Sequence, residues 1–149
     1  MKKFPFLMLL LVLGLASCKD QEEKDRDLIL DYIAEKNLDA IEGASGLYYV
    51  VDSTGNGTFP AASDSVEVDY EGFLLDDSKF DSSLDRGMPA IFSLNQVIRG
   101  WQLGIPYFSE GGSGKLIIPS ELAYGDRSPS ADIPKNSVLV FDIWLYDVR

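Results

Sequence analysis

The sequence predicts an α+β domain in which a twisted antiparallel β-sheet wraps around a short α-helix, with a short N-terminal helix before it. Two observations lead to this fold class. Apolar and polar residues alternate in several short runs that end in turn residues, as in half-buried strands. Apolar residues at helical spacing occur once before these runs and once between them.

The composition limits the possible functions. The chain has 149 residues, 46% of them hydrophobic, which suffices for one domain with a substantial core. Its net charge of −11 disfavours nucleic acid as a partner. The absence of His and the single Cys, Cys18, exclude internal disulfides, thiolate zinc clusters and Ser-His or Cys-His nucleophiles. We therefore expect neither a cofactor nor a metal ion.

The N-terminus has the pattern of an export signal. Two lysines precede an apolar stretch, residues 4–15, that is too short to span a bilayer comfortably. Small residues then lead directly to Cys18, and this arrangement resembles a bacterial lipobox. The resemblance implies that residues 1–17 are a removable signal peptide and that Cys18 carries lipid. We expect a lipid-anchored protein of the cell envelope, on the outer membrane and facing the periplasm or the surface. An ordinary signal peptide with an incidental Cys is the alternative.

Two segments are expected between Cys18 and the domain. Residues 18–26 are rich in charge and are predicted to be an acidic, solvated tether that buries nothing. The tract weakly resembles surface-export signals of some lipoproteins. Residues 27–43 are predicted to form an amphipathic helix, because Leu28, Ile29, Tyr32 and Ile33 recur at helical spacing. This helix is expected to pack on the domain edge or act as a spacer, and a dimerisation helix is the alternative.

The domain itself is predicted over residues 44–149. Strands are expected near residues 47–51, 65–70, 91–94, 115–118 and 138–148. In the second strand, Val66, Val68 and Tyr70 should face the core, and Glu67, Asp69 and Glu71 should face water. In the last strand, the apolar side chains that share one face are Leu139, Phe141, Ile143 and Leu145.

Residues 97–101, with the sequence Val-Ile-Arg-Gly-Trp, open the short helical segment between the strands. A Trp in this setting is more often a core residue that packs a helix on a sheet. It could also form the floor of an apolar pocket. The pattern around Trp101 does not by itself decide between these two interpretations.

Five motifs in register give a family resemblance. They are residues 80–83 (Phe-Asp-Ser-Ser), 97–101, 123–125 (Ala-Tyr-Gly), 133–134 (Ile-Pro) and 139–142 (Leu-Val-Phe-Asp). Together they resemble FKBP-type peptidyl-prolyl cis–trans isomerases, and the resemblance extends over residues 47–148. The fold that this family implies, a twisted antiparallel sheet around a short helix, agrees with the class expected from periodicity.

The resemblance also implies a site. The residues it assigns to catalysis are Tyr70, Phe80, Asp81, Trp101, Tyr124 and Phe141, and those it assigns to substrate binding are Arg86, Val97, Ile98 and Ile133. Trp101 would be the pocket floor. Tyr124 and the backbone N–H of Ile98 would bind substrate carbonyls, and Asp81 would be held at the edge by Tyr70 or Arg86.

The implied activity is rotation of X-Pro peptide bonds in exported proteins, which assists their folding at the envelope. This reaction breaks no covalent bond, so a chain without His can perform it. The partners implied are proline-containing polypeptides, the membrane through the lipid anchor, and macrolide inhibitors. Three departures from the usual pattern, Ala90, Pro129 and Asp132, are expected to make one rim smaller and more polar and to change substrate preference and macrolide affinity. A lipid-anchored chaperone or binding module with little isomerase activity, and a surface lipoprotein that contacts a partner, are the alternatives.

Overall fold

The computed structural model describes residues 10–149. Part of the predicted signal peptide, residues 1–9, therefore lies outside the described residues. The helical segments are α1 (Leu10–Glu35), η1 (Ala44–Gly46), α2 (Ser83–Arg86), η2 (Leu94–Gln96), α3 (Arg99–Gly104), η3 (Ile105–Tyr107) and η4 (Ser120–Leu122). The strands are β1 (Ile41–Glu42), β2 (Tyr48–Ser53), β3 (Ser65–Phe73), β4 (Lys79–Ser82), β5 (Ala90–Ser93), β6 (Ser113–Ile118) and β7 (Leu139–Val148).

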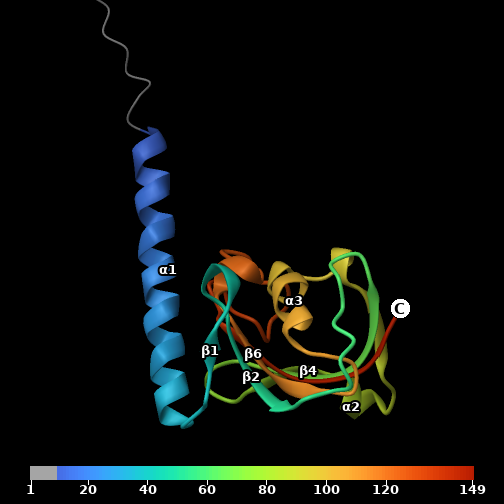
Figure 1. Ribbon diagram of the computed structural model, residues 1–149. Helices are drawn as coiled ribbons and strands as arrows, with labels where there is room; N and C mark the ends of the chain where they lie inside the picture. Colours follow the sequence, from blue (N-terminus) through green and yellow to red (C-terminus); the bar gives the residue numbers. More distant parts are fainter. Residues whose placement is uncertain (1–9) are drawn as a thin grey trace, which may run out of the picture.

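All strand pairs are antiparallel and form one seven-stranded sheet. The order is β1-β2-β6-β7-β3-β4, and β5 pairs with the first half of β3 while β4 pairs with its second half. Figure 1 shows the sheet curving beneath α3. The predicted fold class is thus confirmed. Two strands were not expected, because β1 has only two residues and β4 is mostly polar.

The face of the sheet toward α3 carries the main core. The predicted face of the last strand is confirmed, since Leu139, Phe141, Ile143 and Leu145 are all buried in this cluster. α3 ends early because Pro106 lacks the N–H that a longer helix would need, and the chain continues as a 3-10 turn.

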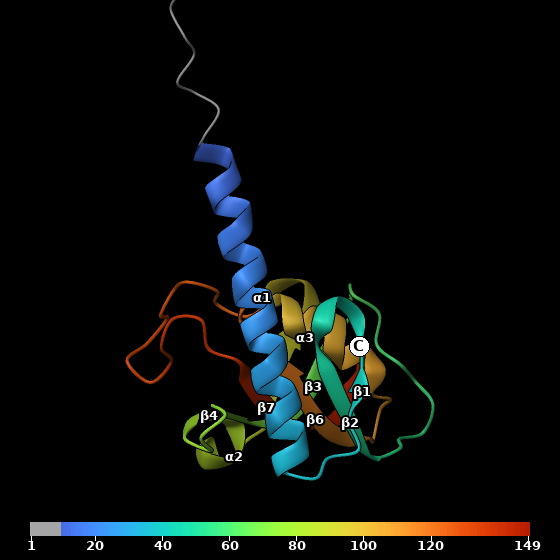
Figure 2. The same cartoon turned by 90° about the vertical axis from the view of Figure 1, so that its left-hand side faces the viewer.

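The opposite face of the sheet is covered by α1. Ile29 and Tyr32 of this helix pack in a second apolar cluster with Ile117 of β6 and Val140 of β7. Figures 1 and 2 show α1 standing against this side of the sheet and extending beyond the domain at its N-terminal end. Both faces of the central strands are therefore buried, which explains why the run from Leu139 to Ile143 is almost continuously apolar.

The predicted tether and helix bounds are wrong. Residues 18–26 belong to α1, and the helix ends at Glu35 instead of residue 43. Asn37, with a φ of 51°, ends the helix in a Schellman arrangement, in which the N–H of Leu38 donates to Ile33 O at 3.0 Å and that of Asn37 to Ala34 O at 3.2 Å. The tether fails as a prediction because Asp25 lies one helical turn before Ile29 on the buried face.

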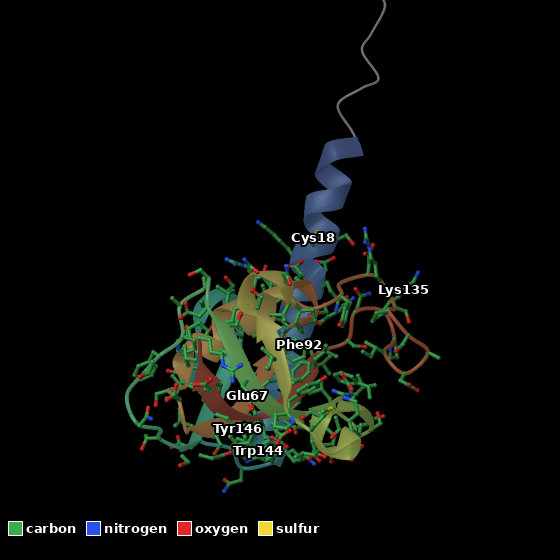
Figure 3. The ribbon with its side chains drawn as sticks, turned by 90° about the vertical axis from the view of Figure 1, so that its right-hand side faces the viewer. Cys18, Glu67, Phe92, Lys135, Trp144 and Tyr146 are labelled. Atoms are coloured by element: carbon green, nitrogen blue, oxygen red, sulfur yellow. The ribbon has the colours of Figure 1, made fainter. Side chains whose placement is uncertain are left out.

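One residue expected to face water is also buried. Asp69, on the outer face of β3, is only 7% exposed. Its carboxylate accepts hydrogen bonds from the hydroxyls of Ser83 at 2.7 Å and Tyr146 at 2.8 Å, which offset the loss of water. Figure 3 places Tyr146 beside Trp144 on this side of the molecule. Within residues 10–149, no helix is long and apolar enough to cross a membrane.

Candidate functional site

A largely apolar hollow of about 370 Å³ opens between α3 and one end of the sheet. Strands β3, β4, β5 and β7 supply four rings to it, and the segment around the start of α3 supplies the base. The residues that line it are Tyr70, Phe80, Asp81, Phe92, Gln96, Val97, Ile98, Trp101, Tyr124 and Phe141.

Trp101 lies at the base of the hollow, 4% exposed. Three rings meet its indole edge-on: Tyr70 at 5.3 Å, Phe92 at 5.4 Å and Phe141 at 5.3 Å between centroids, with interplanar angles of 85° to 89°. Phe80 in turn stands perpendicular to Phe141 at 5.6 Å. Such edge-to-face pairs are favoured by the ring quadrupoles and hold the walls in place. Trp101 therefore packs α3 on the sheet and also lines the hollow, so the two interpretations of Trp101 are compatible, and its role as the floor of a binding pocket stays a prediction.

Two glycines bring α3 close enough to the sheet to form this base. A Cβ on Gly100 would overlap Ile118 of β6, and one on Gly104 would lie 2.7 Å from a methyl group of Leu116. The segment before the helix is held by the side-chain amide of Gln102, which donates to Val97 O at 2.8 Å. Ile98 is the N-cap of α3, so its carbonyl accepts hydrogen bonds from the N–H groups of Trp101 and Gln102. Its own N–H lies outside the hydrogen bonds of the helix.

Gly72 of β3 has a similar role in the wall. A Cβ at this position would lie 2.6 Å from the ring of Phe80 and 3.0 Å from that of Phe141. The absence of a side chain on Gly72 therefore lets both rings approach the strand closely.

The polar edge of the hollow is a closed hydrogen-bonded triangle. Tyr70 Oη donates to Asp81 Oδ2 at 2.6 Å, and Arg86 donates to Asp81 Oδ1 at 2.5 Å and to Tyr70 Oη at 2.8 Å. The backbone N–H of Ser82 also donates to Asp81, at 2.8 Å. Asp81 is held by both partners considered from the sequence, Tyr70 and Arg86. Because Asp81 and Arg86 are nearly half exposed, their ion pair contributes under about 1 kcal/mol to stability, and its main effect is to orient Tyr70 and Asp81.

These surroundings raise the pKa of Tyr70 and lower the pKa of Asp81. Burial raises the pKa of Tyr70 above its ordinary value of 10.0, and the hydrogen bond to Asp81 adds to this effect. Burial also opposes ionisation of Asp81, but the hydrogen bonds from Tyr70 and Arg86 outweigh it and hold the pKa below 3.8. At neutral pH the edge of the hollow therefore carries a neutral phenol, a carboxylate and a guanidinium.

With this geometry in place, comparison with known proteins is informative. The model of the FKBP-type peptidyl-prolyl cis-trans isomerase family matches residues 56–146. This chain belongs to the FKBP family. FkpA of Aeromonas hydrophila is 52% identical over 105 residues, which cover 70% of this chain and 39% of that protein. FkpA of Escherichia coli K12 is 42% identical over 130 residues, covering 87% and 47%.

Solved structures agree. The crystal structure of a peptidyl-prolyl cis-trans isomerase from Pseudomonas syringae pv. tomato matches with a TM-score of 0.76 at 32% identity, covering 87% of this chain and 94% of that one. The chain spans less than half the length of the two FkpA proteins that it matches.

Eight of the ten pocket residues expected from the sequence line the hollow. The other two do not. Arg86 lies behind Asp81, and Ile133 is 6% exposed within the core beside the hollow. The sequence interpretation missed Phe92 and Gln96. Phe92 could have been found, because its alternation with Ala90 in a short strand puts it on the same face as that residue.

Phe92 lies in the same strand as Ala90, two residues further along. Ala90 and Asp132 are not among the lining residues. The ring of Phe92, 5.9 Å from that of Tyr70, is an aromatic part of the lining. The smaller and more polar rim expected from Ala90 and Asp132 stays a prediction. Tyr124, 39% exposed, is the most exposed of the aromatic rings that line the hollow.

Across the part of the chain that the structure describes, no three His, Cys, Asp or Glu residues are grouped as metal ligands would be. Cys18 is exposed on α1, at the same end of the domain as Lys135 (Figure 3). An exposed thiol is accessible to modification.

Proposed function

We propose that this protein is a peptidyl-prolyl cis–trans isomerase that acts on X-Pro bonds of exported polypeptides and assists their folding. The observation that carries the proposal is the aromatic hollow above Trp101, in which four further rings surround a space open to solvent on one side. A proline ring is compact and apolar, and an open aromatic recess can accept it while the chain continues on both sides.

The hollow suits the chemistry of amide rotation. Resonance gives the peptide bond a rotational barrier of about 18–20 kcal/mol, and the planar amide is more polar than the twisted one. An environment with few polar groups therefore favours the twisted state over the planar one, which lowers the barrier. Each tenfold gain in rate requires about 1.4 kcal/mol of such preference.

Two donors beside the hollow can hold the flanking chain. The phenol of Tyr124 is exposed, and the N–H of Ile98 is outside the hydrogen bonds of α3. Each can donate to a carbonyl on one side of the proline and fix the substrate in a turn. Asp81 cannot act as a general base for this reaction, which transfers no proton, so its role is to place Tyr70 and set the field at the edge.

A protease-free assay with short proline peptides tests the proposal. The purified protein should accelerate cis-to-trans exchange, and a peptide panel that varies the residue before proline measures its preference. Absence of acceleration for every peptide, with suppression of aggregation retained, would favour the chaperone or binding module instead. Competition by a macrolide in the same assay tests the expected inhibitor site.

Replacing Asp81 by Val should lower kcat/KM about three- to tenfold. The change removes the acceptor that orients Tyr70 and leaves Arg86 bonded to the phenol alone, but it keeps the apolar walls. We expect a stability loss of at most about 1 kcal/mol, because both side chains of the lost ion pair are nearly half exposed. Asp85→Val removes a carboxylate from α2 outside the triangle and should leave the rate unchanged.

The rate should be independent of pH between about pH 5 and 9. The pKa of Asp81 is depressed, so its contribution to stability is present above 3.8 and is lost only as pH falls through the lower folded value. The pKa of Tyr70 is raised, so the phenol stays neutral past pH 10. Stopped-flow rates across this range, with folding checked by circular dichroism, measure the profile. A bell-shaped profile centred near neutrality would mean that another titrating group participates.

The N-terminal pattern supports a proposal for the location. We propose that residues 1–17 are removed, that Cys18 is lipidated, and that the isomerase acts at the cell envelope. The support is the lipobox-like sequence and the exposure of Cys18. Palmitate label should enter the wild type and be absent from Cys18→Ala, and equal labelling of the two would refute the anchor.

A further inference from the structure

The N-terminal helix carries a buried carboxylate that the proposed reaction does not use. Asp25 of α1 is fully buried. Its Oδ2 accepts two hydrogen bonds from Ser120, the first residue of η4, from the backbone N–H at 2.7 Å and from the hydroxyl at 2.5 Å. Its Oδ1 accepts one from the side-chain amide of Gln21, one helical turn earlier, at 2.7 Å.

Such an arrangement needs a reason, because a buried carboxylate is costly unless its oxygens are hydrogen-bonded. Here all three bonds come from neutral donors, and charge-assisted bonds of this type are stronger than neutral ones. Ser120 is also fully buried. Without Asp25, its backbone N–H and its hydroxyl would therefore have no water molecule as an alternative hydrogen-bond acceptor. The contact thus fixes Ser120 to α1 across 95 residues of sequence.

Ser120 is in turn the attachment point of Tyr124. The carbonyl of Ser120 accepts from the N–H of Ala123 at 3.0 Å and from that of Gly125 at 2.8 Å, on either side of Tyr124. On the far side, Gly125 O accepts from Asn136 N at 2.7 Å. The backbone that carries Tyr124 is therefore held at Ser120, and Ser120 is held by the helix.

We propose that Asp25 is a positioning residue for Tyr124, so that α1 is part of the construction of the peptide-binding site. The inference rests on the proposed function, in which Tyr124 donates to a substrate carbonyl. It also assigns a role to the helix beyond packing. Cys18 lies two helical turns before Asp25 and borders the same groove as Glu121 and Asp126. A change in how α1 packs on the domain would therefore shift Ser120 and, with it, the position of Tyr124 at the hollow.

Peptide isomerisation by a set of variants in the full chain tests this proposal. Asp25→Ala should lower kcat/KM about tenfold, since a displacement of about 1 Å in a positioned group has effects of this size or larger. Asp25→Asn, whose amide oxygen can still accept from Ser120, should stay within about twofold of wild type. Ser120→Ala removes one of the two bonds and should have a smaller effect in the same direction. Asp31→Ala, an exposed acid on the same helix, is the matched control and should have no effect.

A double-mutant cycle separates positioning from loss of stability. If Asp25 acts through Tyr124, then adding Asp25→Ala to Tyr124→Ala should change the rate by less than about twofold. A full tenfold further loss in that background, or an Asn variant as impaired as the Ala variant, would overturn the proposal. If Asp25→Ala does not fold, the proposal is tested with the other two variants. Asp25→Asn should stay within about twofold of wild type, and the loss caused by Ser120→Ala should disappear when Tyr124→Ala is also present.

Amide hydrogen exchange gives a readout that does not depend on activity. Exchange at Gly125 should increase at least about tenfold in Asp25→Ala, while exchange at Leu145, whose N–H donates to Gly112 O in the core sheet, should stay near the wild-type value. An inactive wild type would refute the proposed function, and exchange at Gly125 would still decide whether Asp25 holds the loop. Unchanged exchange at Gly125 would overturn the link itself.

Discussion

Replacing Phe141 by Ala should lower kcat/KM about 100-fold or more and the free energy of unfolding by about 3–5 kcal/mol. The ring is 6% exposed and stands edge-on to Trp101 and Phe80, with Tyr70 at 6.4 Å. Its removal opens the wall between the base and the rim and admits water to the hollow. Water favours the polar planar amide, so the preference for the twisted state falls. A 100-fold loss corresponds to about 2.7 kcal/mol.

The stability loss must be separated from the loss of rate. Activity is therefore measured at a temperature where circular dichroism shows the variant to be folded. Phe141→Leu keeps an apolar side chain of similar bulk and should retain more stability while still losing about tenfold in rate. Tyr146→Ala truncates an exposed ring on the opposite face of β7 and should leave the rate unchanged. A folded Phe141→Ala protein with nearly wild-type kcat/KM would refute the role of the hollow.

The sequence was sufficient for features that depend on local period and spacing. The alternation around Phe141 predicted which face of the last strand is buried, because strand side chains point alternately to the two sides. The resemblance then brought Phe80, Trp101 and Phe141 to one place, although they are far apart in the chain. A set of family motifs predicts such long-range contacts, whereas the periodicity of a single segment does not.

Features that depend on a distant partner could not be predicted. Asp25 lies in a run of charges that is typical of solvated chain, and only Ser120, 95 residues later, makes its burial possible. Asp69 has the alternation of an exposed strand residue, and Tyr146 from another strand removes it from water. In both cases a specific hydrogen bond overrides the composition of the segment.

Replacing Gly100 by Ala should lower the free energy of unfolding by about 2–3 kcal/mol and kcat/KM about tenfold. The new Cβ would overlap Cγ2 of Ile118 and lie 2.7 Å from its Cδ1. Ile118 is fully buried in the core, so its side chain has little room to move and α3 must shift away from the sheet. Trp101 is the next residue, and such a shift would carry the base of the hollow out of contact with the surrounding rings.

Denaturant unfolding and the peptide assay measure the two effects, with Arg99→Ala as a control on the exposed side of the same helical turn. Ile118→Ala tests the cause, because it removes all the atoms that the new Cβ approaches. The double variant Gly100→Ala/Ile118→Ala should be destabilised by less than the sum of the single variants and should recover part of the lost rate. Strict additivity in both measurements would mean that close approach of α3 to β6 does not set the position of Trp101.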